Sequence, residues 1–448
     1  MTRLWPLAAM LLLCVAGAAF ADWLAPDPSY RDAQAQLRQA LRDTLGHGTE
    51  PARLDTLGQA LLRLGRFDEA RAVYGRTLAL AAADAGANAA FGKLALFADR
   101  LGEAESLLSA AVAAGGDLEP LADLYATLLR RGAYARAAEL APKLNDPGRV
   151  PMLDYLAEHP PYRVTAGPDE AKVRWSKGYP VPLVRVKLNG HSVLMALDTG
   201  SRDLIVDASS SRVCDVKMIS LKTLVFWDGA RVAVQNAVVQ RLELGGLTLE
   251  DLPAGVVGLR KWSLEVNPQA EPVAGVIGLG LLRQFTATLD YGQQTLELRR
   301  PGRPFPVGPD AQRVPFELWG ESELTVYGSL NGGRRMALVV QSGVAGCGVA
   351  APSAVLDEVG VKAGRMARLI KGAGSVLQGR PWTAVTVPNV AVGPLLREKV
   401  AGWSGALDDS ELWRHGVRRD GILSHDFFRD QRVTIDWGRH ELVVEGKP

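Results

Sequence analysis

The chain has 448 residues, with 51 Lys plus Arg against 49 Asp plus Glu and a formal net charge of +2. This length exceeds what one compact core normally supports, so we expect two or three domains. The charges are mixed in sign, without a basic stripe or interleaved aromatic residues, which argues against a nucleic-acid-binding surface.

Residues 1–21 have the pattern of a secretory signal peptide. Arg3 gives a short basic start, an apolar stretch runs from Leu4 to Phe20, and Ala19-Phe20-Ala21 is a small-x-small cleavage site. An uncleaved membrane anchor is the alternative. No other stretch is long and apolar enough to span a bilayer. We therefore expect a bacterial periplasmic or secreted protein, with no membrane span once the signal is removed.

Residues 28–158 are predicted to form helical repeats. The segment is rich in Ala, Leu and Arg, with apolar positions at helical spacing and a period near 34 residues. Gly58 recurs as Gly92 and Ala70 as Ala104, small residues that let paired helices approach closely. The pattern is similar to tetratricopeptide repeats, which stack into a curved surface that binds a protein partner. An ordinary antiparallel helical bundle is the alternative.

A turn-rich segment at 159–171, which begins His159-Pro160-Pro161, is predicted to link this half to the next. Beyond it, one pattern occurs twice. Apolar residues 193–197 are followed by Asp198-Thr199-Gly200-Ser201, and apolar residues 337–340 are followed by Gln341-Ser342-Gly343-Val344.

The spacing around these two turns also matches. Asp290 follows Asp198 by 92 residues, inside Thr-Leu-Asp-Tyr-Gly, and Asp436 follows Gln341 by 95 residues, inside Thr-Ile-Asp-Trp-Gly. Two copies of one strand-and-turn order at nearly equal spacing indicate two homologous lobes, at 172–302 and 310–446.

Taken together, these residues resemble the aspartic protease superfamily. Each lobe is similar to a retropepsin-like unit, and two in tandem resemble the bilobal pepsin plan. The resemblance implies an all-β domain with a cleft between its lobes and a peptide or protein substrate lying across that cleft. It implies that Asp198 is the catalytic carboxylate and that Ser201 hydrogen-bonds it. The turns would be completed and locked together by Thr199, Gly200, Ser342 and Gly343.

Gln341 stands where the resemblance places a second catalytic aspartate. The chemistry of that family needs two carboxylates that share one proton. An amide is neutral at every pH, so it donates and accepts hydrogen bonds but cannot complete the acid-base exchange, which is worth roughly 10²–10⁴ in rate.

Three interpretations follow. The first, which we favour, is an aspartic endopeptidase that reaches a second carboxylate in another way, for example by pairing two lobe-1 units in a homodimer. The second is a pseudoprotease that binds peptides without cleaving them. The third is a scaffold in which the helical repeats bind a partner and the β half is passive. For Asp198 itself, a solvated turn aspartate is the alternative.

Residues 224–232 are predicted to form a hairpin with an Asp-Gly turn. By position it is the flap of lobe 1, which places Trp227, Asp228 and Gly229 against the substrate; a plain surface hairpin is the alternative. Residues 371–375 are a weaker counterpart in lobe 2.

Other site chemistries find no support in the sequence. The six histidines are scattered without metal-ligand spacing, and no phosphate-binding glycine loop is present, so we expect no metal and no cofactor. Once the signal is removed, only Cys214 and Cys347 remain. A disulfide between them and two buried thiols are both open.

Overall fold

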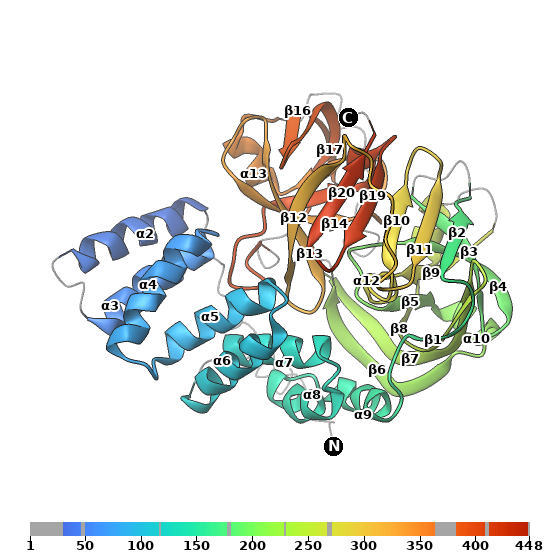
Figure 1. The fold of residues 1–448 in the computed structure, drawn as a ribbon, viewed down its shortest axis with the longest axis horizontal. Coiled ribbons are helices and arrows are strands. Elements are labelled where there is room, and N and C mark those ends of the chain that lie inside the picture. The colour runs from blue at the N-terminus through green and yellow to red at the C-terminus, as the bar shows by residue number, and fades with distance from the viewer. Residues whose placement is uncertain are drawn as a thin grey trace, which may run out of the picture.

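The computed structural model describes residues 30–45, 50–115, 118–176, 181–227, 230–266, 271–362, 382–407 and 412–446. Within these ranges a helical N-terminal half is followed by a β-rich C-terminal half (Figure 1). The predicted fold class is confirmed at this level. The predicted signal peptide, residues 1–21, lies outside the described residues. None of the described helices combines the length and the apolar character needed to cross a membrane.

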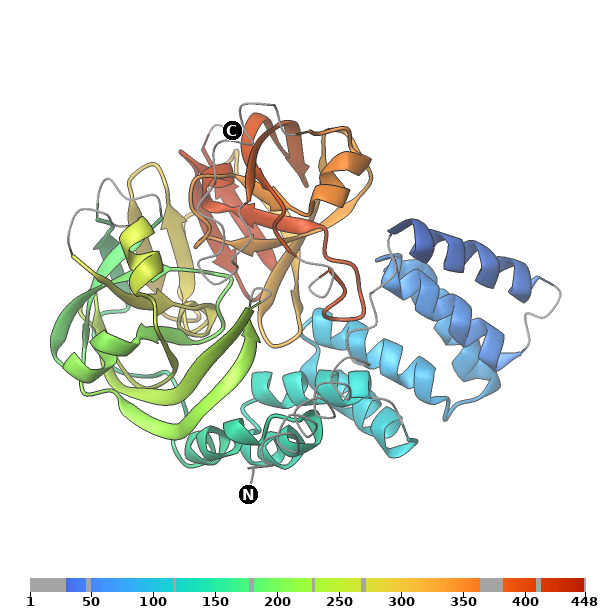
Figure 2. The same cartoon turned by 180° about the vertical axis from the view of Figure 1, so that it is seen from behind.

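The helical half forms an arc in which helices that are neighbours along the chain lie side by side. From the free end at α2, the arc leads to α8 and α9 beneath the β half (Figures 1 and 2). Its described α-helices are α2 (Tyr30–Thr44), α3 (Pro51–Arg63), α4 (Phe67–Leu80), α5 (Ala85–Phe97), α6 (Leu101–Ala113), α7 (Leu118–Arg130), α8 (Tyr134–Leu140) and α9 (Val150–Glu158).

Glycines at the predicted interval bring paired helices together. A Cβ atom added at Gly58 would lie 2.7 Å from the ring of Tyr74, so α3 and α4 pack with no room for a side chain there. A Cβ added at Gly92 would lie 2.6 Å from Leu108 Cγ, which gives α5 and α6 the same contact 34 residues later. The structure thus repeats the close contact with the period seen in the sequence, while the likeness to tetratricopeptide repeats stays a prediction.

The turns inside the helix pairs are also repeated. After α3, the Gly65 amide donates to the carbonyl one position before the helix end and the Arg66 amide to the carbonyl two positions before it, and the same two bonds follow α5 and α7. Each of these turns has one residue in the left-handed conformation. It is Gly65 (φ 70°) after α3, Asp99 (φ 55°) after α5 and Gly132 (φ 71°) after α7. Glycine is the residue that this position favours, so Asp99 is an exception, and its side chain supplies the reason below.

The described residues of the β half form two sheets. The first has the strand order β1-β8-β5-β9-β4-β3-β7-β6. Its strands are β1 (Arg163–Ala166), β3 (Leu183–Leu188), β4 (His191–Leu197), β5 (Leu204–Asp207), β6 (Lys217–Trp227), β7 (Ala230–Leu244), β8 (Leu247–Val257) and β9 (Val273–Ile277).

The second sheet has the order β14-β18-β15-β17-β16-β13-β12-β20-β19-β10-β11-β2. Its strands are β2 (Glu170–Arg174), β10 (Thr286–Asp290), β11 (Thr295–Arg299), β12 (Gln312–Trp319), β13 (Glu323–Leu330), β14 (Met336–Gln341), β15 (Val349–Ala351), β16 (Thr383–Val392), β17 (Leu395–Ser404), β18 (Gly421–Ser424), β19 (Arg432–Asp436) and β20 (Glu441–Glu445). Short helices α10 (Ala208–Val213), α11 (Arg260–Val266), α12 (Leu279–Leu282) and α13 (Ser353–Glu358) join some of them.

Residues 172–302 and 310–446, called lobe 1 and lobe 2 below, pair their strands in the same way. In lobe 1, β4 runs parallel to β9, β5 antiparallel to β9, and β5 parallel to β8. In lobe 2, β14 runs parallel to β18, β15 antiparallel to β18, and β15 parallel to β17. The repeated sequence order therefore corresponds to a repeated strand order.

The two lobes share a continuous stretch of sheet. Strands β2, β11 and β10 are followed by β19, β20 and β12, and the joint is the antiparallel pair β10–β19. There Thr288 lies opposite Thr434, with 2.8 Å between their hydroxyl oxygens. Trp437 Nε1 also donates to the carbonyl of Phe285 at 3.0 Å. The lobes are therefore joined by main-chain pairing as well as by side chains.

The segment 159–171, expected as a linker, is partly built into lobe 1. Its strand β1 pairs with β8, with Arg163 opposite Glu250. Tyr162 is buried and its hydroxyl donates to Asp203 at 2.8 Å. The turn residues of the segment were visible in the sequence, but its pairing with a strand more than 80 residues away has no local signal.

Asp99 connects the helical half to both lobes. Its carboxylate accepts hydrogen bonds from Arg130 of α7 and, at 2.5 Å, from Arg283 of lobe 1, and it lies 3.6 Å from His440 Nε2 of lobe 2. Burial opposes its charge, but the contact with His440 and the two guanidinium groups hold the pKa of Asp99 well below its usual range. This explains why an aspartate replaces glycine at the repeated turn.

A second contact fills part of the concave side of the helices. Buried Lys93 of α5 donates to the carbonyl of His415 at 2.7 Å and pairs with Glu119 and Asp123 of α7. The Arg63 guanidinium lies 4.9 Å from the centre of the Trp413 ring. The lobe-2 segment 412–418 therefore occupies part of this surface, against α3, α5 and α7.

Candidate active site

The strands β4 and β14 each end at one of the two predicted turns. Leu197, the last residue of β4, is paired in parallel with Ile277, and Asp198 follows directly. Gln341, the last residue of β14, is paired in parallel with Ser424. Each strand is paired on both sides and is buried in the residues just before its turn, so the backbone holds the two turns in fixed positions.

A reciprocal set of hydrogen bonds joins the two turns. The Thr199 hydroxyl donates to the Val340 carbonyl at 2.7 Å and accepts from the Ser342 amide at 3.1 Å. In return, the Ser342 hydroxyl donates to the Leu197 carbonyl at 2.9 Å and accepts from the Thr199 amide at 3.1 Å. Thr199 and Ser342 are both buried. Neither turn can move without breaking bonds to the other.

The Asp198 carboxylate accepts hydrogen bonds from both lobes. Its Oδ1 accepts from the Gly200 amide at 2.8 Å and from the Gly343 amide of lobe 2 at 3.2 Å. Its Oδ2 accepts from the Ser201 hydroxyl at 3.2 Å. These donors orient the carboxylate and complement its negative charge.

Asp198 and Gln341 each lie against the glycine of the opposite turn. A Cβ atom at Gly343 would come within 2.5 Å of Asp198 Cγ, and a Cβ at Gly200 would come within 2.5 Å of Gln341 Cγ. Any side chain at either glycine would displace the group beside it. The structure therefore brings together Asp198, Gln341 and the five turn residues that the sequence singled out, with the carboxylate and the carboxamide on opposite sides of the joint.

Lobe 2 differs from lobe 1 at a second place. Behind the first turn, a Cβ at Gly278 would lie 2.4 Å from the carbonyl oxygen of Asp203. Behind the second turn, the corresponding strand ends in Ser424, whose hydroxyl donates to the Val344 carbonyl at 2.5 Å. The second turn therefore has a side-chain hydrogen bond behind it where the first has a glycine in close contact with backbone.

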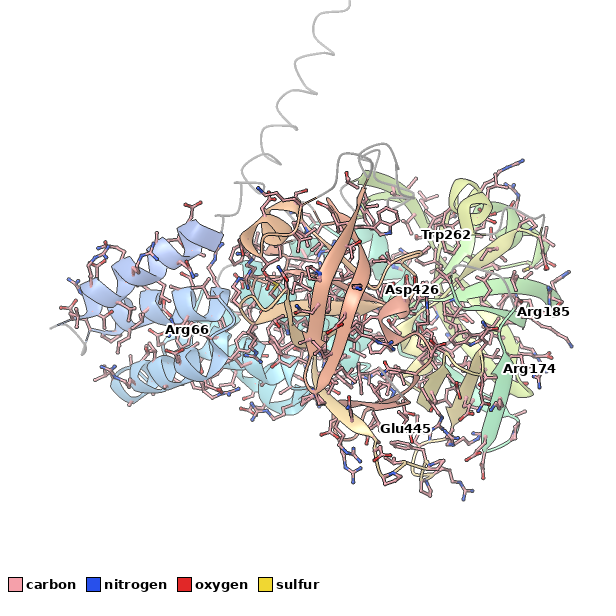
Figure 3. All side chains as sticks on the ribbon, turned by 90° about the horizontal axis from the view of Figure 1, so that it is seen from above. Arg66, Arg174, Arg185, Trp262, Asp426 and Glu445 are labelled. Atoms are coloured by element: carbon pink, nitrogen blue, oxygen red, sulfur yellow. The ribbon has the colours of Figure 1, made fainter. Side chains whose placement is uncertain are left out.

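His425 follows Ser424 and was not singled out by the sequence. It is buried, its Nε2 lies 3.6 Å from Asp426 Oδ1, and Asp426 lies near the middle of the β half (Figure 3). Burial lowers the pKa of His425, while Asp426 works against that change. A histidine has thus been placed beside the turn that lacks its carboxylate.

The predicted flap is described only in part. Strands β6 and β7 form a hairpin in which Trp227 pairs with Ala230. Asp228 and Gly229 lie outside the described residues, as does the lobe-2 segment 371–375. The hairpin is therefore shown, while its contact with a substrate stays a prediction.

A cavity of about 400 Å³ is lined in part by Gly200 and Ser201 of the first turn. Lobe 1 supplies much of its lining, Glu321 of lobe 2 lies on one side, and Arg149 and Met152 of the helical half lie on another. Arg149 Nη1 donates to Glu321 at 2.8 Å and Arg202 pairs with the same carboxylate. Burial opposes its charge, but both guanidinium groups hold the pKa of Glu321 well below its usual range.

Among the described residues, no group of three or more His, Cys, Asp or Glu side chains is arranged to hold a metal ion. Cys214 and Cys347 are both buried and do not form a disulfide. Burial raises the pKa of both thiols, so neither has the character of a reactive thiolate.

One part of the chain is similar to a known protein family. Residues 184–281 match the family described as aspartyl protease. The match begins in β3, includes Asp198 and its turn, and ends in α12, so it covers much of lobe 1 and no part of lobe 2. No curated protein matched the chain. Lobe 1 thus has a protease-like domain, and the arrangement of lobe 2 is known from geometry alone.

Proposed function

We propose that this protein is an aspartic-type endopeptidase that cleaves peptides or proteins outside the cytoplasm, with Asp198 as its catalytic carboxylate. The observation that carries the proposal is the Asp198 carboxylate itself. It accepts amide hydrogen bonds from Gly200 of its own lobe and Gly343 of the other, and a hydroxyl hydrogen bond from Ser201. The aspartyl protease match around this turn supports the same chemistry.

In the proposed reaction a single carboxylate transfers the proton. Asp198 accepts a proton from water while the water oxygen bonds to the scissile carbonyl carbon. The Gln341 amide donates a hydrogen bond to the carbonyl oxygen as it becomes negative. Protonated Asp198 then returns its proton to the amide nitrogen, and the C–N bond breaks to release an amine and a carboxyl group. Gln341 stays neutral throughout, so this reaction lacks the shared proton of a two-aspartate site.

The geometry favours a single chain over a homodimer of lobe-1 units. The face of lobe 1 that carries Asp198 is already joined to lobe 2 by Thr199 and Ser342. The adjoining strand β10 is paired with β19. A second lobe 1 would have to displace both contacts before its own aspartate reached Asp198.

The alternative function is that of a pseudoprotease, and Gln341 favours it. Because an amide cannot exchange protons, the second turn supplies positioning without acid-base chemistry, a loss of roughly 10²–10⁴ in rate. The joined turns would then hold a bound peptide without cleaving it.

The deciding experiment measures cleavage of a mixed peptide library by the purified chain over a range of acid and neutral pH. Endopeptidase activity that is lost in Asp198→Asn supports the proposal. Cleavage that survives Asp198→Asn overturns it. Peptide binding without any cleavage at high enzyme concentration identifies the pseudoprotease.

The remaining expectations are also proposals. Export rests on the signal pattern of residues 1–21. The partner expected on the helical repeats would bind the part of the concave surface that segment 412–418 leaves open. A cavity of about 310 Å³, lined by Asp55, Arg63 and Lys93 and on its other side by Gly416 of that segment, lies next to it.

A further inference from the structure

We infer that the helical half forms one wall of the substrate cleft and selects an apolar side chain of the peptide. This inference rests on the proposed function and concerns the 400 Å³ cavity beside the Asp198 turn. The wall consists of residues 146–156 near the end of the helical half, which include most of α9.

The cavity begins within two residues of the carboxylate. Gly200 and Ser201 line it, and their amide and hydroxyl groups hydrogen-bond Asp198. Ile205 and Val234 of lobe 1 line it farther out, and both side chains are partly exposed. The cavity is therefore lined by residues that hold Asp198 in place, which makes it the candidate site for a side chain of a peptide bound there.

The helical wall is fixed against the hairpin of lobe 1. Met152 and Leu156 of α9 are buried and pack in one cluster with Val238 of β7. The Asn236 side chain donates to the Gly148 carbonyl at 3.1 Å, and Lys217 Nζ lies 4.5 Å from the centre of the Tyr155 ring. These contacts hold α9 at the base of the β6–β7 hairpin, so the cavity has a permanent third wall.

The charged groups that line the cavity are paired with one another, and Arg149 also lies 3.8 Å from Asp146. Glu321 is paired with Arg149 and Arg202, and Arg202 also contacts Asp203 at 2.9 Å. A charged substrate group would have to break these pairs or stay unpaired, which is costly in a buried site. The rest of the lining includes Met152, Leu156, Ile205, Val234 and Pro253. The cavity therefore accepts an apolar side chain such as Leu, Ile or Met.

The test separates binding from cleavage by using the full chain carrying Asp198→Asn. A peptide library with one randomised position is bound to it, and the retained peptides are identified by mass spectrometry. We expect Leu, Ile and Met to be enriched at one position. Met152→Ala should shift the enrichment at least threefold toward Phe, and Met152→Trp should shift it toward Ala and Val. Asp154→Ala, on an exposed position of the same helix, should leave the enrichment unchanged.

A cross-linking measurement needs no change at Met152 and covers the case in which those variants do not fold. A retained peptide with benzophenone at the selected position should cross-link to residues 146–156. Cross-links confined to lobe 1 and lobe 2, or an enrichment that is the same in the Met152 variants, would overturn the proposal that the helical half forms a wall of the cleft. Neither result would contradict the proposed peptidase activity. Cleavage that does not depend on Asp198 would overturn the proposed function instead.

Discussion

The two turns of the β half have the same backbone arrangement and different chemistry. Both follow a buried strand that is paired in parallel with the strand behind it, and each turn gives a hydroxyl to the other. Lobe 1 presents a carboxylate at the joint and lobe 2 presents a carboxamide. The comparison shows that both turns carry the same hydroxyl brace although one presents a carboxylate and the other an amide.

The difference extends behind the turns. Lobe 1 has Gly278 and Leu279 where lobe 2 has Ser424 and His425, and all four are buried. The lobe-2 turn thus has a side-chain hydrogen bond behind it, from Ser424 to the Val344 carbonyl, where the lobe-1 turn has a glycine in close contact with backbone. The predictions below test whether these differences affect catalysis or only the support of the fold.

The largest effect is expected at Asp198. Asp198→Asn keeps the shape of the side chain but removes the proton acceptor, so cleavage should fall by roughly 10²–10⁴. Rate measurements on one peptide check this. Asp290→Asn is the matched control, because Asp290 Oδ1 accepts a turn hydrogen bond from the Gln293 amide and asparagine can accept the same bond. Equal losses in both variants would indicate a structural cause.

Gln341→Asp should make the two turns chemically alike. The variant restores two carboxylates that share a proton, so the cleavage rate should rise by up to roughly 10²–10⁴ and peak at acid pH. The natural protein should instead gain activity as Asp198 ionises and then reach a plateau. Gln341→Ala should lower the rate, because the hydrogen bond to the developing oxyanion is lost. A bell-shaped acid optimum in the natural protein would contradict the single-carboxylate reaction.

Removing the hydroxyl of Thr199 or that of Ser342 should lower the stability of the fold by similar amounts, because each makes two of the four hydrogen bonds between the turns. Thr199→Val leaves the Val340 carbonyl and the Ser342 amide without their partner, and Ser342→Ala does the same to Leu197 and Thr199. Each should cost about 1–3 kcal/mol of unfolding free energy, measured in urea. Since all four bonds form one unit, the double variant should cost less than the sum of the two. Strict additivity would show that the turns are independent.

The repeated features were predictable because they are local or periodic. Gly58 and Gly92 stand at the helix contacts that their 34-residue interval indicated, and the turn at Asp198 follows its apolar strand. The joining of the two turns was expected only through the family resemblance.

The contacts between the helical half and the lobes could not be predicted. Lys93 and His415 are 322 residues apart, and Arg149 and Glu321 are 172 apart, with no pattern linking either pair. The role of Asp99 could not be predicted from the sequence for another reason. It occupies a position that glycine favours, and only the folded arrangement of Arg130 and Arg283 around it explains the substitution.

The smallest effect is expected at His425, the residue that lobe 1 replaces with Leu279. Because burial lowers the pKa of His425 in the folded state, the unfolded chain binds the proton more readily. Protonation therefore favours unfolding, and stability should decline as the pH falls below the ordinary histidine pKa of about 6.5. His425→Leu should remove this decline, by about 1.4 kcal/mol for each unit of pKa change. Urea unfolding at neutral and mildly acid pH measures the difference. Parallel pH profiles for both proteins would show that His425 titrates alike in the folded and unfolded chain.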